Sequence, residues 1–235
     1  MLEPIRHIIT RQRNFLASTS PRRQEILQSV KFKFEVIKPD FEENLDKQSF
    51  SHPCEYVKEN AKQKAMSVWR LLHKESKPCD LIIGCDTVVT LDDQIYEKPK
   101  NAEDAIVMLT KLGGRTHTVF TGVALVTNCN NKNSGFNQTI EEGTTDVDDY
   151  IIHSNSLDDF LVTTFHEATD VTMTEMNESV IHAYVNSGEP FDKAGGYGIQ
   201  GIGSTLIESI RGDYFNVVGL PIHRLAKELY YMYME

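Results

Sequence analysis

The 235-residue chain is poor in cysteine, and it lacks any long apolar run. Its cysteines, Cys54, Cys79, Cys85 and Cys129, include no Cys-x-x-Cys pair, which favours reduced thiols. No apolar stretch is long enough to cross a bilayer. The first residues also lack the basic-then-apolar pattern of a secretion signal. Together these absences predict a cytoplasmic protein.

Basic residues are also in short supply. Against 34 Asp and Glu there are 24 Lys and Arg, so the formal net charge is -10. Nucleic acids and anionic membranes attract proteins through a basic face. We therefore expect neither as a partner, although a small polyanion could still bind if positive charge is concentrated in one pocket. With 40% hydrophobic residues, the chain can bury an ordinary core as one large domain or two small ones.

The most informative segment, Phe15–Leu27, has the pattern of an apolar strand end, a hydroxyl-rich turn and a helix. Ser20 is a good N-cap and Pro21 a good first helical residue. Arg22 and Arg23 then fall in the first helical turn, where the helix dipole favours acidic side chains. Hydroxyls, free N–H groups and two guanidinium groups in one place predict an anion site, above all for phosphate. The alternative is a solvated helix start whose arginines pair with nearby carboxylates.

The hydrophobic pattern predicts alternating strands and helices in a single α/β or α+β domain. Strands are expected at 32–37, 81–90, 95–99, 116–126 and 157–173, and helices at 53–73, 101–113, 177–186 and from 221 to the C-terminus. A second hairpin is expected around 211–213. We interpret 1–13 as a loose N-terminal extension and 14–235 as the domain. Residues 127–156, dominated by Asn, Gly, Ser, Thr and Asp, are predicted to form a mobile insertion.

Asp86 interrupts the apolar strand run 81–90. A carboxylate buried there is costly unless it is paired, protonated or bound to metal. Lys98, which leaves the neighbouring hairpin strand, and Lys64, which falls in the apolar stripe of helix 53–73, are expected to reach it. Two plainer interpretations remain: Asp86 could accept hydrogen bonds from backbone amides, and Lys64 could extend its ammonium to the surface.

Residues 188–203 contain six glycines in sixteen positions, which would let the backbone approach a ligand closely. Asp192, Lys193 and Gln200 could supply polar contacts there. The signal is weak alone, because glycine-rich loops also serve as turns. It matches neither a P-loop nor a dinucleotide-binding fingerprint.

Together these segments resemble the Maf family of nucleotide pyrophosphatases. Several linked motifs follow one another in family order: Leu16–Leu27, Ala61–Ala65, Gly84–Val89, Glu97–Pro99, Leu112–Gly122, Gly188–Gly201 and Val217–Pro221. The resemblance implies a long twisted mixed sheet in two lobes, like that of the inosine-triphosphate pyrophosphatases, with the active site in the cleft. It also implies a homodimer that hydrolyses nucleoside triphosphates to the monophosphate and pyrophosphate with a divalent cation, Mg²⁺ or Mn²⁺.

Carried over by position, the resemblance makes Asp86 the acid–base residue that activates water, with Lys64 and Lys98 as further catalytic residues. Glu43 matches an acidic position that, with Asp86, would hold the metal. Thr87 and Gln200 match positions tied to base selection. Further matched residues would hold the triphosphate together with Lys64 and Lys98: Ser18, Ser20, Arg22 and Arg23. Asp192 and Lys193 are expected to make other polar contacts with the substrate.

Subfamily choice depends on one residue. The branch that prefers methylated guanosine triphosphate resembles Ser-Pro-Trp at the phosphate loop, whereas this chain has Ser20-Pro21-Arg22, like the branch acting on dTTP and UTP. The resemblance therefore predicts a dTTP/UTP pyrophosphatase that removes modified pyrimidine nucleotides. Three alternatives stay open: action on 7-methyl-GTP or a non-canonical purine triphosphate, a regulator of cell division without turnover, and a nucleotide sensor that binds without hydrolysis.

Overall fold

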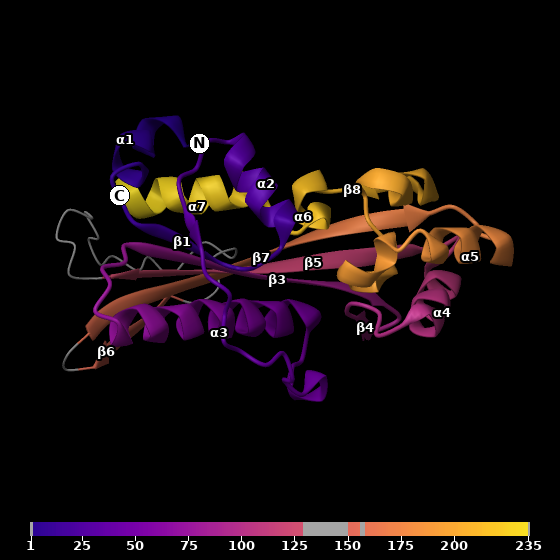
Figure 1. Cartoon of the computed structure of the whole chain (residues 1–235), viewed down its shortest axis with the longest axis horizontal. Helices are drawn as coiled ribbons and strands as arrows, with labels where there is room; N and C mark the ends of the chain where they lie inside the picture. Colours follow the sequence, from indigo (N-terminus) through magenta and orange to yellow (C-terminus); the bar gives the residue numbers. More distant parts are fainter. Residues whose placement is uncertain (1, 129–149, 156–157, 235) are drawn as a thin grey trace.

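A computed structural model describes residues 2–128, 150–155 and 158–234 (Figure 1). Its frame is one mixed sheet of eight strands. The longest strands, β3 (Leu81–Leu91), β5 (Thr116–Asn128) and β7 (Asp158–Met173), lie side by side and antiparallel. Their register places Asp86 opposite Gly122, and Gly122 opposite His166. These strands run the length of the molecule, and helices pack against them at both ends (Figure 1).

Shorter strands extend this central sheet. β1 (Asn14–Ala17) runs parallel to both β3 and β2 (Glu35–Val36), so the chain leaves β1 and β2 at the same edge of the sheet. β6 (Tyr150–Asn155) pairs with β7 on the other side. β4 (Gln94–Tyr96) and β8 (Ile207–Arg211) form antiparallel ladders with β3 and β7 beyond the main path.

Helices cover both faces of the sheet (Figure 1). α3 (Pro53–Lys74) lies along one face. The opposite face carries α1 (Arg6–Ile9), α2 (Pro21–Ser29), α6 (Tyr214–Val218) and α7 (Ile222–Met234). At the other end of the long strands lie α4 (Ala102–Leu112) and α5 (Glu178–Asn186). Short 3₁₀ turns occur at η1 (Glu3–Ile5), η2 (Lys47–Ser49), η3 (Glu189–Asp192), η4 (Ala194–Gly196) and η5 (Gly201–Leu206).

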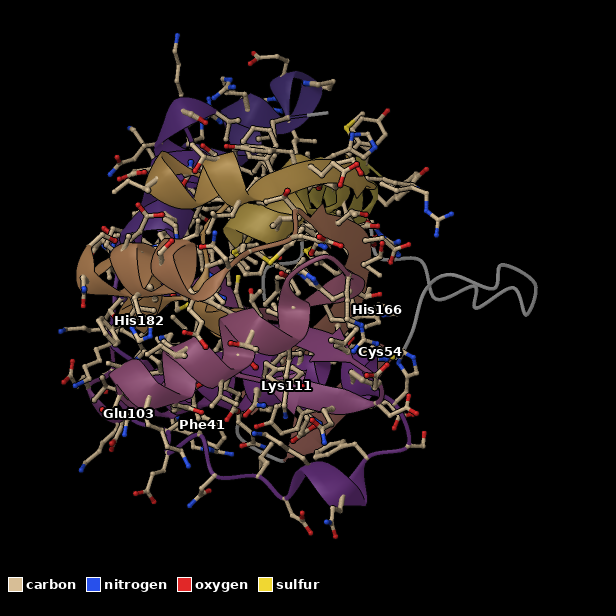
Figure 2. The ribbon with its side chains drawn as sticks, turned by 90° about the vertical axis from the view of Figure 1, so that its right-hand side faces the viewer. Phe41, Cys54, Glu103, Lys111, His166 and His182 are labelled. Carbon is tan, nitrogen blue, oxygen red and sulfur yellow. The ribbon has the colours of Figure 1, made fainter. Side chains whose placement is uncertain are left out.

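The buried apolar residues form separate clusters, one under α3, one under the α1–α2–α7 layer, and one around α4 and α5. Figure 2 looks at the molecule from the α4–α5 end, where α4, with Glu103 and Lys111, lies in front and His182 of α5 lies above it. The predicted α/β class, with one twisted mixed sheet in a single domain, is confirmed. Within the described ranges, no helix is both long and apolar enough to cross a membrane.

Local signals predicted several boundaries correctly. The Asn101 and Asn177 side chains accept hydrogen bonds from the N–H groups of Asp104 and Val180, so α4 and α5 begin close to the predicted starts at 101 and 177. β3 is buried along almost its whole length, as expected of a central strand.

Three expectations need correction or restriction. The hairpin expected at 211–213 is absent, because Asp213 accepts a hydrogen bond from the Phe215 N–H and starts α6. The N-terminal segment is not loose, since Ile5 and Ile9 are fully buried against α7 and the sheet. The insertion predicted at 127–156 lies mostly outside the described residues; its first two residues belong to β5, and 150–155 form β6.

Candidate active site

A cavity of about 610 Å³ opens where β1, β2 and the middle of β3 meet the glycine-rich segment. All residues singled out from the sequence line it, although they come from segments far apart in the chain. They are Ser18, Ser20, Arg22, Arg23, Glu43, Lys64, Asp86, Thr87, Lys98, Asp192, Lys193 and Gln200. The fold thus brings the predicted site together, while the role of each residue stays a prediction.

Lys64 joins two carboxylates at the floor of this cavity. Its Nζ lies 2.7 Å from Asp86 Oδ1 and 2.8 Å from Glu43 Oε2. Lys64 and Asp86 are both buried, whereas the Glu43 side chain is half exposed. A buried charge needs such partners. Lys64 therefore points into the site and does not extend its ammonium to the surface.

The environment shifts the pKa values of the two carboxyl groups in opposite directions. Burial raises the pKa of Asp86, and the nearby Glu43 adds to the rise, although Lys64 works against both. Burial also raises the pKa of Glu43, but the charge and hydrogen bond of Lys64 outweigh it, so that this pKa falls below its ordinary value. Two carboxyl groups with pKa values moved apart are a common arrangement for acid–base chemistry.

Two glycines let α3 come close enough to the sheet for this contact. A Cβ on Gly84 would lie 2.2 Å from the Ala61 carbonyl oxygen, and one on Gly122 would lie 2.5 Å from the Val57 carbonyl oxygen. Real Cβ atoms do not approach backbone so closely, so both positions need glycine. The close packing of α3 carries Lys64 onto Asp86, which faces the same side of β3 as Gly84.

Lys98 differs from expectation. It lines the cavity and is exposed, but within the described ranges it makes no ion pair with Asp86. Glu43 instead completes the Lys64 pair, from a segment without regular secondary structure. The proximity of Lys98 still helps to lower the Glu43 pKa. Lys98 thus remains available to a ligand in the cleft.

The two arginines after β1 differ in their contacts: Arg22 pairs with a carboxylate, whereas Arg23 contacts neutral oxygens. α2 begins with Pro21 at its first position, but the Ser20 side chain makes no capping hydrogen bond. Arg22 pairs with Asp192, at 2.6 Å from Nη1 to Oδ2, as the carboxylate alternative predicts. Arg23 donates from Nη1 to Ser18 Oγ at 3.1 Å, and its remaining contacts are also neutral oxygens. Within the described ranges Arg23 therefore makes no ion pair, although its charge lies close enough to act on the pKa values of Glu43 and Asp86.

The glycine-rich segment forms the far wall. Lys193 Nζ donates to the Glu189 carbonyl oxygen at 2.6 Å and to Asp192 Oδ1 at 2.7 Å, so Asp192 joins Arg22 to Lys193. Gln200 lies exposed on the cavity wall. Because Asp192 and Lys193 are bound to each other, only Gln200 of the predicted contacts in this segment has its polar group uncommitted within the described structure.

A buried pair ties this wall to the sheet. The Tyr197 hydroxyl lies 2.6 Å from His117 Nε2, and both residues are buried. Burial lowers the pKa of His117 to about 4, so the ring is neutral at pH 7. Histidine in a strand is more often a structural residue than a catalyst, and here it anchors a residue that lines the cavity.

Sequence reasoning missed two charged residues that line the cavity, Lys38 and Glu97. Lys38 directly follows the expected strand 32–37. Its place at the end of that strand was the one signal that could have indicated a position near the turn after β1. Glu97 belongs to the motif Glu97–Pro99, from which no role for it was predicted. Its carboxylate accepts from the Tyr56 hydroxyl at 2.7 Å and from Lys47 Nζ at 2.8 Å, contacts that no local pattern predicts.

Glu43 and Asp86 are the carboxylates of the site that could serve as oxygen donors to a divalent ion. Both carboxylates contact the Lys64 ammonium, which lies between them. In the described part of the chain no three His, Cys, Asp or Glu side chains gather to hold a metal. Mg²⁺ often takes one or two carboxylates and fills its other positions with water and substrate phosphates. Glu43 and Asp86 have that chemistry, and Lys64 lies between them.

Fold and site thus define an α/β protein with two arginines at the turn after β1 and a buried carboxylate in the same cleft. The Maf-like protein family model matches residues 13–232, and the chain belongs to this family. A human protein named "Probable bifunctional dTTP/UTP pyrophosphatase/methyltransferase protein" is 43% identical over 234 residues, which is 99% of this chain and 34% of the human one. The chain therefore spans about a third of that relative.

Bacterial relatives match along nearly their whole length. The dTTP/UTP pyrophosphatase of Clostridium perfringens (strain 13 / Type A) is 40% identical over 215 residues, 91% of this chain and 94% of that protein. The protein of the same name from Bacillus cereus (strain ATCC 14579) is 40% identical over 214 residues, 91% of this chain and 92% of that protein. The similarity thus extends over about nine tenths of this chain.

Proposed function

We propose that this chain hydrolyses nucleoside triphosphates, with dTTP and UTP preferred, to the monophosphate and pyrophosphate. The observation that carries the proposal is the buried Asp86 carboxylate, with its raised pKa, on the floor of a cleft lined by cationic side chains. A triphosphate is the kind of small polyanion that such a cleft can hold in a protein of net charge -10.

In the proposed mechanism, Asp86 accepts a proton from the water that attacks the α-phosphorus. A base is most effective when its pKa lies near the working pH, and burial moves Asp86 in that direction. Lys64 keeps the carboxylate oriented and partly neutralised. Arg23 and Lys98, which lack carboxylate partners in the described ranges, would stabilise charge on the pyrophosphate leaving group.

Glu43 and Asp86 would hold the divalent cation, Mg²⁺ or Mn²⁺. When bound, such an ion neutralises phosphate charge and polarises the phosphorus–oxygen bonds. Glu43 suits this role because its lowered pKa keeps it ionised at neutral pH.

The pyrimidine preference is supported by the names of the relatives and by Arg22 at the position where the methylguanosine branch has tryptophan. Thr87 and Gln200 are the residues we assign to base selection. We further propose that the protein is a cytoplasmic homodimer and that it removes modified pyrimidine nucleotides from the triphosphate pool.

The reaction can be tested with a substrate panel in water enriched in oxygen-18. The purified chain is given dTTP, UTP, CTP, GTP, 7-methyl-GTP or ITP with Mg²⁺ or Mn²⁺, and products are weighed by mass spectrometry. We expect turnover of dTTP and UTP, with the heavy oxygen in the monophosphate. Heavy oxygen in pyrophosphate would mean attack at the β-phosphorus and contradict the mechanism.

The same panel tests the alternatives. Turnover of purine triphosphates alone would overturn the substrate assignment while keeping the chemistry. Nucleotide binding without any turnover would contradict the enzyme proposal and favour a sensor or a regulator.

A further inference from the structure

A buried row of hydrogen bonds leads from α6 to Arg23. Thr121, on β5, is fully buried and lines no part of the cavity. Its Oγ1 lies 3.0 Å from the Asn216 carbonyl oxygen and 3.0 Å from Thr87 Oγ1. Thr87 Oγ1 in turn lies 3.0 Å from Arg23 Nη2. A residue that touches no ligand is thus connected to a cation that faces the cleft.

The direction of these bonds follows from proton counting. A threonine hydroxyl has one hydrogen to donate, and a carbonyl oxygen can only accept. The Thr121 hydroxyl therefore donates its hydrogen to the Asn216 main-chain carbonyl oxygen and must accept a hydrogen bond from the Thr87 hydroxyl. Because the Thr87 hydroxyl already donates to Thr121, it can only accept from the Arg23 guanidinium, which has N–H donors and no acceptor. All the contacts are satisfied in this one arrangement.

The far end of the row is firmly held. Asn216 is fully buried, and its Nδ2 donates to the Val119 carbonyl oxygen and to Thr169 Oγ1, both at 3.0 Å. The main-chain carbonyl oxygen of Asn216 also accepts a hydrogen bond from the Gly219 N–H at 3.0 Å. α6 is therefore fixed to β5 and β7, and the acceptor for Thr121 has a defined position.

At the near end, the row helps to hold the Arg23 guanidinium. Nε donates to the Gly219 carbonyl oxygen at 2.8 Å, Nη1 to Ser18 Oγ and Nη2 to Thr87 Oγ1. A guanidinium has five N–H groups. Within the described ranges no protein acceptor takes the remaining two. Every one of these acceptors is neutral, so these contacts orient the cation without pairing it to a carboxylate.

We propose that Thr121 is a positioning residue for phosphate binding: by accepting from Thr87 it makes Thr87 a pure acceptor and so holds Arg23 with its free N–H groups toward the anion in the cleft. The inference deepens the proposed function and rests on its phosphate-binding cleft. If Thr87 were free to turn its hydrogen toward Arg23, donor would face donor and the guanidinium would lose one of its anchors.

The test is the binding of inorganic pyrophosphate by calorimetry, which needs no turnover. Thr121→Val removes the hydroxyl at nearly constant volume, and Asn216 keeps its bond from the Gly219 N–H. Loss of one bond that orients a charged group should weaken binding roughly five- to tenfold. Thr121→Ser keeps the hydroxyl and should bind within about twofold of the wild type. Circular dichroism and thermal melts establish that each variant is folded.

A mutant cycle separates positioning from general support of the fold. Because Thr121 acts through Thr87, Thr121→Val should cost less than about twofold when added to Thr87→Val. An equal loss in both backgrounds would overturn the proposal, as would unchanged pyrophosphate affinity in Thr121→Val or absent binding by the wild type. If Thr121→Val does not fold, Thr87→Val alone must lose roughly five- to tenfold in affinity, and no loss would overturn the proposal.

This result is separable from the proposed reaction. A wild type that binds pyrophosphate with the expected coupling but hydrolyses no triphosphate would contradict the reaction and leave the role of Thr121 standing. Normal triphosphate hydrolysis together with unchanged pyrophosphate affinity in Thr121→Val would support the reaction and overturn the role of Thr121.

Discussion

The contacts of Lys64 show how much of the site depends on single residues. Its ammonium is the common partner of Asp86, from a buried strand, and Glu43, from an irregular segment. The local sequence indicates the first pairing, because an aspartate in an apolar run and a lysine in an apolar helix face each need a partner. It does not indicate the second, since nothing in the pattern around Glu43 fixes its place in space.

His117 allows a prediction about stability at the residue scale. Burial lowers its folded pKa to about 4, whereas an unfolded chain has about 6.5. The unfolded chain therefore binds this proton more tightly, so the contribution is complete above pH ~6.5 and is lost as the pH falls toward ~4, by up to about 3 kcal/mol. His117→Gln should abolish that part of the acid destabilisation.

The measurement is the free energy of unfolding between pH 7 and pH 4.5, from urea titrations. His223→Gln, at an exposed position of α7, is the control and should keep the pH dependence of the wild type. Equal pH dependence in the wild type and in His117→Gln would show that His117 does not carry this effect.

At the scale of elements, the site depends on how closely α3 lies on the sheet. Gly84 and Gly122 leave room for the helix backbone, and Lys64 projects from that helix onto Asp86. The sequence predicted the helix and the strand, because their apolar patterns are long and clear. It did not predict the distance between them, which depends on tertiary packing.

Gly84→Ala should separate these two elements. The added Cβ would lie 2.2 Å from the Ala61 carbonyl oxygen, so α3 must move. Overpacking of this kind costs about 2–3 kcal/mol of unfolding free energy, and displacement of Lys64 should reduce kcat at least tenfold, by rough estimate. Urea titration and a pyrophosphate-release assay measure the two effects.

Gly113→Ala is the matched control, because the nearest atoms to its added Cβ lie 3.3 Å away and include the flexible Met176 side chain. It should change stability less and leave activity intact. Equal effects of the two substitutions would contradict the account of α3 packing.

The elements that sequence reasoning missed are short ones. Asp213 caps α6, a helix of five residues, where a turn between strands was expected. The sequence around it, Arg211-Gly212-Asp213, is typical of a hairpin turn. The Asp213 cap and the contacts of Asn216 with β5 and β7 favour the helix instead. Tertiary contacts therefore decided the structure where the local signal was brief.

At the scale of the whole molecule, the N-terminal segment belongs to the core. Leu2, Ile5 and Ile9 join the cluster that contains Leu225 and Leu229 of α7, and Figure 1 shows both chain ends on the same side of the sheet. The segment was expected to be a loose extension. Its apolar residues are spaced to bury one face against a helix far away in the chain.

Ile5→Ala should therefore destabilise the protein by about 2–4 kcal/mol, as truncation of a fully buried isoleucine does. Val107→Ala, at a position of α4 that is 50% exposed, should change the unfolding free energy by less than about 0.5 kcal/mol. Urea titrations of both variants provide the comparison. Similar stability in Ile5→Ala and the wild type would mean that the segment does not contribute to the fold.

Segments far apart in the chain line one cleft, and Asp86 is the group on which its proposed chemistry depends. The most direct measurement is pyrophosphate release from dTTP and UTP by the wild type, Asp86→Asn and Asp92→Asn. The last is a control on the exposed turn after β3, where Asp92 pairs with Arg115. We predict that Asp86→Asn loses roughly a thousandfold or more in kcat while it stays folded, and that Asp92→Asn keeps full activity. Turnover by Asp86→Asn within about tenfold of the wild type would contradict the assignment of Asp86 as the base.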